Sequence, residues 1–172
     1  MKYLNILLDN ERNDDQYREE CIEAFDKYQN EYRKTRLKLP KNFVRIYEGN
    51  HRFHDAKIPV FSVLTEYSGF NRSSRKSRPS KVRFIIVDYD NSELVWEVMI
   101  DNILDIEIYC CLTEAPIFLE HFINDELLIE QNGYLSWDIF FSSGVEIKLV
   151  FKSLKIKELG KDEISKFRYE TT

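Results

Sequence analysis

Apolar residues recur along this chain with two different periods, and the change of period divides it into two parts. From Asn13 to about Lys34 they return every three or four residues, which predicts a helix with one apolar face. A second, shorter helix is predicted from Pro40 to about Gly49, because proline suits a first helical turn. Residues 1–50 are therefore expected to be mostly helical.

From residue 51 to residue 159 the period is two, which predicts strands. Strands are predicted at 56–67, 82–89, 96–100, 104–108, 127–130, 135–141, 145–151 and 154–159. Asn132-Gly133 and Ser142-Ser143-Gly144 are expected as hairpin turns, and Pro59 places the first strand at an edge or in a bulge. A helical turn is expected at 116–122, and residues 160–172 form a polar tail.

Two polar pairs interrupt the alternation. Asp101-Asn102 and Lys152-Ser153 each stand between two predicted strands, and Asp101-Asn102 is expected to end the first of its two strands. The stretches 96–108 and 147–159 consequently resemble each other, each as strand, polar pair and strand. Two similar meanders would produce this pattern, and so would any consecutive hairpins.

Together these patterns predict one α+β domain. One or two N-terminal helices would pack on a mainly antiparallel, meander-like sheet of about six to eight strands. The sheet could be strongly curved, and the pattern does not decide whether it is open or closed. A chain of 172 residues suits a single domain. Its twelve Phe and ten Tyr residues also favour strands, where large rings pack well.

Several classes of protein do not fit the sequence. The apolar start is followed at once by acidic residues, unlike a signal peptide, and no apolar run approaches the roughly 20 residues of a membrane span. Three cysteines, two of them adjacent, do not suggest a disulfide framework. We therefore expect a cytoplasmic protein.

Charge is distributed unevenly along the chain. The net charge of −5 combines +9 over residues 36–83 with −13 over residues 84–150, where Lys148 is the only basic side chain. The two blocks could face each other and cancel, or the acidic strands could present a surface to a cationic partner. The candidate residues for such a surface are the strand carboxylates Asp105, Glu107, Asp138 and Glu146.

A basic segment offers a different candidate. Residues 68–83 contain six positive side chains and no acidic one, and Arg72, Arg75, Lys76 and Arg78 could hold phosphates. A serine-rich, charged segment is also typical of a solvated hairpin loop, and the isoelectric point near 5.4 is unusual for a nucleic-acid-binding protein.

Histidines are grouped in the run His51-Arg52-Phe53-His54-Asp55. A metal site would need further ligands there, and the sequence offers no second ligand cluster, so His54 and Asp55 are expected to have a structural role at the entrance to a strand. No glycine-rich phosphate loop or nucleophile elbow occurs. We predict no catalytic residue, no metal and no cofactor.

The run Phe53-His54-Asp55-Ala56-Lys57-Ile58 resembles the first strand of several small bacterial families. The segments 134–141 and 143–147 resemble the β-rich body of the same proteins, which include immunity-like proteins encoded beside polymorphic toxins. The resemblance spans roughly residues 53–157 and implies no catalytic residues.

The sequence thus favours a non-enzymatic protein-binding module of immunity-like or regulatory type, with a basic partner for its acidic strands. A nucleic-acid or phosphate-binding domain that uses residues 72–83 remains the alternative. The patterns do not indicate an oligomeric state.

Overall fold

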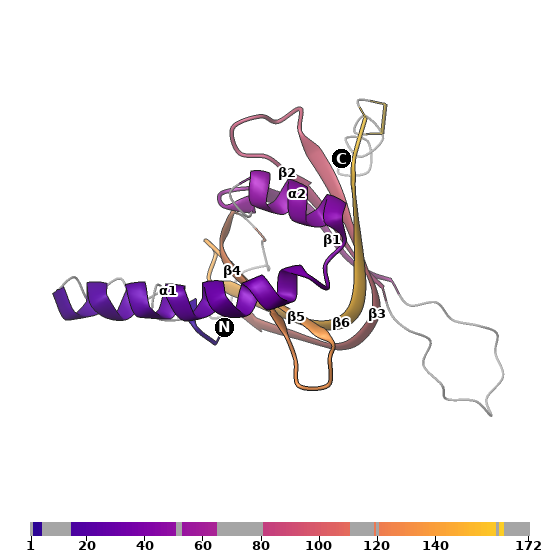
Figure 1. Ribbon diagram of the computed structural model, residues 1–172. Helices are drawn as coiled ribbons and strands as arrows, with labels where there is room; N and C mark the ends of the chain where they lie inside the picture. Colours follow the sequence, from indigo (N-terminus) through magenta and orange to yellow (C-terminus); the bar gives the residue numbers. More distant parts are fainter. Residues whose placement is uncertain are drawn as a thin grey trace.

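The computed structural model describes residues 2–4, 15–50, 53–64, 81–110, 119, 121–160 and 162–163. It contains two helices and one six-stranded antiparallel sheet, which confirms the α+β prediction. The elements are α1 (Asp15–Arg36), α2 (Lys41–Gly49), β1 (Lys57–Leu64), β2 (Lys81–Val87), β3 (Val95–Cys110), β4 (Phe122–Ile129), β5 (Leu135–Phe141) and β6 (Val145–Glu158). The strand order is β1-β2-β3-β6-β5-β4, and the strands curve around α2 (Figure 1).

The helix α2 supplies the apolar face that the concave side of the sheet needs. Its Phe43 and Tyr47 rings stack on each other and meet the indole of Trp137 edge-on. The start predicted at Pro40 is confirmed, since Pro40 occupies the position before the first helical residue. Burial of these large rings stabilises the fold through the apolar area that they remove from water.

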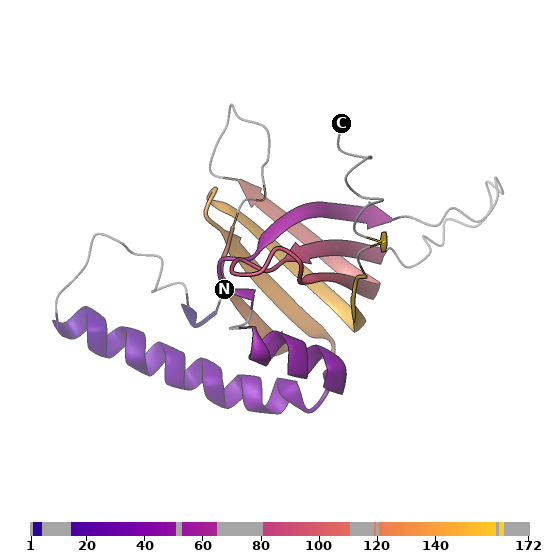
Figure 2. The same cartoon turned by 90° about the horizontal axis from the view of Figure 1, so that it is seen from above.

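The helix α1 is only partly packed. Figure 2 shows both helices on the same side of the sheet, with α1 reaching well past it. Its buried residues, Tyr28, Tyr32 and Thr35, all lie in its second half. The Tyr28 hydroxyl accepts the backbone N–H of Leu127 at 3.1 Å, which joins α1 to the edge strand β4.

The strands β3 and β6 are longer than the sequence predicts. They pair from Trp96↔Glu158 to Cys110↔Val145, so the two stretches that resemble each other in sequence are partners in the sheet. The strand end predicted at Asp101-Asn102 is wrong, because β3 continues through this pair. The strands predicted on either side of Lys152-Ser153 are likewise one strand, β6.

The polar pairs instead mark where the alternation of faces changes. In β6 the buried positions are odd-numbered as far as Phe151 and even-numbered from Leu154 onward. In β3 the register shifts between Ile103 and Asp105, and Asn102 has a positive φ of 56°. A bulge of this kind bends the strand and increases its twist, which fits the strong curvature of this sheet.

The hairpin turns follow the sequence. Gly133 and Gly144 have φ values of 83° and 78°, which glycine adopts without the steric cost of a side chain. At the other edge of the sheet, Pro59 lies where the β1–β2 register shifts, as its missing N–H predicts. The helical turn expected at 116–122 falls mostly outside the described residues, and its last residue, Phe122, begins β4.

The N-terminal segment is held to the sheet by a buried carboxylate. Glu126 is fully buried, and its carboxylate accepts the backbone N–H groups of Lys2, Tyr3 and Leu4, the first two at 2.6 Å. Such bonds replace the water that a charged carboxylate loses on burial. Among the described residues, no helix is long and apolar enough to cross a membrane.

Candidate functional site

Three of the four predicted carboxylates gather at one end of the two long strands. Asp105 and Glu107 lie on β3, where Glu107 pairs with Lys148 of β6, and Glu146 of β6 pairs with Tyr109 of β3. Asp105, Glu107, Tyr109 and Glu146 are therefore neighbours on the outer face of the sheet, and we call these four residues the acidic strand end. All four are exposed or half-buried.

The acidic strand end changes the chemistry of its tyrosine. The Tyr109 hydroxyl donates to Oε2 of Glu107 at 2.7 Å. This hydrogen bond holds the pKa of Tyr109 above its ordinary value of 10.0, and the charges of Glu107, Glu146 and Asp105 raise it further. A phenol that resists ionisation among carboxylates is a sign of negative potential around its oxygen.

Asp138, the fourth predicted carboxylate, lies on the same face but is only 7% exposed. It pairs with Lys148 on one side and with the buried Glu126 on the other. Burial raises the pKa of the Asp138 carboxyl, the charge of Lys148 opposes that rise, and the charge of Glu126 adds to it. Asp138 is thus covered and does not contribute to an exposed surface.

Large apolar side chains accompany the acidic strand end. Leu104, Ile108 and Tyr109 are 55%, 44% and 54% exposed. Alternation predicts that Leu104 and Ile108 face inward with Ile106, but among the described residues β2 pairs only with positions 95–100 of β3. Beyond Ile100 no described strand pairs with β3 on that side, and Leu104 and Ile108 are exposed among the described residues. No signal in the sequence could locate them, because the extent of β2–β3 pairing is a relation between two strands.

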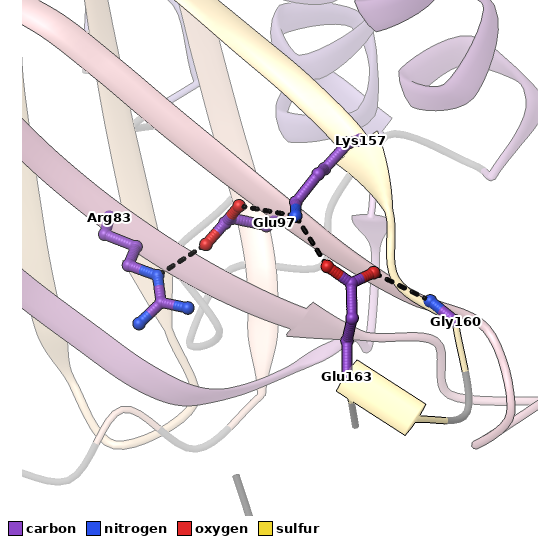
Figure 3. A network of polar contacts seen from close by, with 5 residues as sticks. All are labelled: Arg83, Glu97, Lys157, Gly160 and Glu163. Atoms are coloured by element: carbon purple, nitrogen blue, oxygen red, sulfur yellow. Dashed lines mark hydrogen bonds and ion pairs between the residues drawn. The ribbon is translucent and has the colours of Figure 1, made fainter. Parts of the chain in front are cut away.

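At the other end of β3 the carboxylates are paired. Glu97 lies 2.6 Å from Nε of Arg83 and 3.5 Å from Nζ of Lys157, and Lys157 also contacts Glu163 (Figure 3). Asp101 lies 3.9 Å from Nζ of Lys155. The Arg83–Glu97 contact joins the basic and acidic blocks of the sequence. Ion pairing therefore accounts for this end of β3, and the acidic strand end carries the remaining negative side chains of the strand.

The basic segment cannot be placed relative to this surface. Arg72, Arg75, Lys76 and Arg78 lie outside the described residues, and their proposed role in phosphate binding stays a prediction. His51 also lies outside them.

His54 and Asp55 stand in a strained connection between α2 and β1. Nδ1 of His54 lies 2.9 Å from Oδ2 of Asp55, and Phe53 and Asp55 have positive φ values of 60° and 63°. The reversal directs Phe53 into the core, where it is 1% exposed. The Asp55 N–H donates to the carbonyl of Phe122 at 2.7 Å, which fixes the entrance to β1 against the start of β4.

His54 also borders two hollows of about 580 and 740 Å³. The larger one brings it together with Asp55, Asp88 and Asp90. Among the described residues, however, no group of three or more His, Cys, Asp or Glu side chains is arranged to hold a metal ion. The two described cysteines, Cys21 and Cys110, are half-buried thiols on different elements.

Comparisons with known proteins identify no family. No protein-family model matches the sequence, and no curated protein matches it. Among solved structures, the chain is similar to an uncharacterized protein from Neisseria gonorrhoeae, with 16% identity over 62% of this chain and 94% of that one, at a TM-score of 0.37.

Proposed function

We propose that this chain is a non-enzymatic protein-binding module of immunity-like or regulatory type, and that the acidic strand end binds a basic protein. The observation that carries the proposal is the presence of carboxylates and large exposed apolar side chains on the same stretch of β3. Charged residues raise the rate of encounter and select the partner, and apolar residues supply affinity once water is displaced.

The distribution of charge supports a cationic partner. Glu97 and Asp101 have basic neighbours within 4 Å, whereas the acidic strand end has Lys148 as its cross-strand basic neighbour. Exposed tyrosine beside apolar residues is also typical of interface centres. An immunity-like role fits this chemistry, since an acidic surface can cover the cationic site of a nuclease.

The test is capture of partner proteins from the source cell by the immobilised chain. We compare the wild type with the double variant Asp105→Lys/Glu107→Lys and with a matched control, Asp90→Lys/Glu158→Lys. The control makes the same change of charge at two exposed carboxylates away from the acidic strand end. We expect basic proteins to bind the wild type and the control, and to bind the double variant at least about tenfold less, since two reversed contacts cost over 1.4 kcal/mol.

Circular dichroism and the thermal midpoint establish that each variant is folded before capture. Equal capture by all three proteins would overturn the proposal. Capture that a nuclease abolishes, and that the double variant retains, would favour nucleic-acid binding by the basic segment instead.

A further inference from the structure

Among the described residues, β3 is paired on both sides as far as Ile100 and on its β6 side alone beyond it. On the β6 side the strand is paired from Trp96 to Cys110, whereas on the β2 side its pairing ends at Ile100. From residue 101 to residue 110, therefore, no described strand lies on the β2 side of β3. At about 3.3 Å per residue this edge is roughly 30 Å long.

The two outer strands of the sheet, β4 and β1, have features that hinder pairing with another chain. On β4, Leu127 donates its N–H to Tyr28 of α1, and Phe122 exchanges backbone hydrogen bonds with Asp55 and Ala56. On β1, Pro59 removes a donor where the register shifts. Helical cover, proline and bulges are the usual means of protecting an edge from pairing with another chain.

On the β3 edge, a side chain occupies one of the backbone amides that an added strand would use. The Ile106 N–H donates to Oδ1 of Asp105 at 2.9 Å, although Ile106 lies opposite Leu149 of β6. An amide directed at β6 would donate to a β6 carbonyl, so this amide lies on the open side. Amides alternate in direction along an antiparallel strand, and the Ile108 amide therefore lies on the open side as well.

Side chains on the two faces specify what could pair there. Asp105, Glu107 and Tyr109 lie on the outer face, whereas Ile106 and Ile108 share the inner face. An added strand places its own side chains alternately on the same two faces, about 4.8 Å away. Basic side chains would meet the carboxylates, and apolar side chains would cover Ile108.

A second copy of this chain fits the edge poorly. Antiparallel pairing of two β3 edges would bring the carboxylates of one copy beside those of the other, and like charges opposite each other destabilise a sheet. Charge thus favours a basic strand over self-association.

We propose that residues 102–110 of β3 accept an extended segment of a partner protein as an added strand, in which basic and apolar residues alternate. This inference rests on the proposed function and specifies how the partner is bound. A lysine or arginine of the segment draws the Asp105 carboxylate away, and the Ile106 amide then donates to the backbone of the segment. Main-chain bonds supply affinity and the alternating side chains supply specificity.

The test uses a synthetic peptide of about nine alternating lysine and valine residues with blocked ends, since that length matches the edge. Two further peptides have the same sequence, one N-methylated at every lysine and the other at every valine. In an added strand the backbone N–H groups of alternate residues face the protein, so N-methylation of one set abolishes pairing and N-methylation of the other does not. Fluorescence anisotropy measures binding to the whole chain.

We expect the unmodified peptide and one of the N-methylated peptides to bind, and the other to bind at least about tenfold more weakly. The amides of Ile106 and Ile108 should become protected from hydrogen exchange when the peptide binds. The Ile108→Pro variant should lose peptide binding and keep its thermal midpoint, because proline is tolerated where an edge N–H faces solvent.

Equal binding of both N-methylated peptides would mean that charge alone holds the peptide, which overturns strand addition and leaves the proposed function standing. Partner capture that depends on Asp105 and Glu107, combined with no peptide binding, would likewise overturn strand addition and leave the proposed function standing. Loss of both peptide binding and charge-dependent capture would overturn both proposals. Concentration-dependent dimerisation that protects the Ile106 amide would identify a second copy as the occupant and overturn the inference.

Discussion

The indole N–H of Trp137 donates to Oδ2 of Asp125 at 2.6 Å, in the interior of the protein. The hydroxyl of Tyr47 donates to the same oxygen at 2.5 Å. Asp125 is 3% exposed, and both donors are fully buried. One carboxylate thus joins α2, β4 and β5 by accepting hydrogen bonds from two buried donors.

Removal of the Asp125 carboxylate should therefore be costly. We expect Asp125→Ala to lower the free energy of unfolding by about 3 kcal/mol, because the loss of an acceptor costs roughly 1–3 kcal/mol for each buried donor. Asp125→Asn keeps one acceptor oxygen and should cost less. Urea unfolding measures both changes, and an alanine variant as stable as the asparagine variant would contradict the network.

Asp138 should make stability depend on pH. Burial raises the pKa of its carboxyl in the folded state above the ordinary value of 3.8, so the folded protein holds this proton more tightly than the unfolded chain does. The contribution of Asp138 to stability is therefore present below pH 3.8 and is lost as the pH rises through the folded-state pKa.

The Asp138→Asn variant resembles the protonated form at every pH. We expect it to match the wild type in the free energy of unfolding at low pH and to exceed it at neutral pH. Urea unfolding of both proteins from pH 3 to pH 8 measures the difference, in which other titrating groups cancel. An asparagine variant that is less stable at neutral pH would refute this expectation.

The positive φ of 63° at Asp55 gives a sharp comparison between two small residues. Glycine adopts this conformation readily, whereas alanine is strained there. We expect Asp55→Gly to be more stable than Asp55→Ala by about 1 kcal/mol, as measured by thermal or urea unfolding. Both variants lose the contact with His54, so that loss cancels in the comparison, and equal stability would contradict the backbone conformation.

Tyr109 reports on the acidic strand end. Its pKa is raised by the hydrogen bond to Glu107 and by the surrounding carboxylates. We expect Glu107→Gln to lower the pKa of Tyr109 towards 10.0, whereas Glu158→Gln, at the far end of β6, should leave it unchanged. Titration of ¹³C-labelled tyrosine by NMR measures both values, and equal shifts in the two variants would argue against the cluster.

Short-range pattern was sufficient for most elements of the fold. The period of the apolar residues predicted both helices, and the alternation around Trp137 and Ile147 predicted the β5–β6 hairpin with its glycine turn. The same alternation placed Asp105 and Glu107 together on one face of β3. These features depend on neighbours within a few residues, which a sequence pattern records directly.

The polar pairs in β3 and β6 do not end a strand, as the sequence predicts for Asp101-Asn102, because a bulge and a strand end have the same sequence pattern. Asp101 and Ser153 are paired with each other, so a polar interruption in each strand meets the other inside a continuous ladder. Only the pairing with the neighbouring strand shows whether a polar pair marks a bulge, where the side chains change face, or the end of the strand.

From the sequence alone, periodicity determined that helices precede an antiparallel sheet and that acidic residues line one of its faces, because alternation is a local property of the backbone. The tertiary structure decided which of these residues are accessible. Glu126 and Asp138 have the same outward pattern as Glu107, yet Glu126 is covered by Lys2, Tyr3 and Leu4 from more than 120 positions away. Among the described residues, β2 likewise pairs with β3 only as far as Ile100, a relation between two strands that neither strand encodes alone.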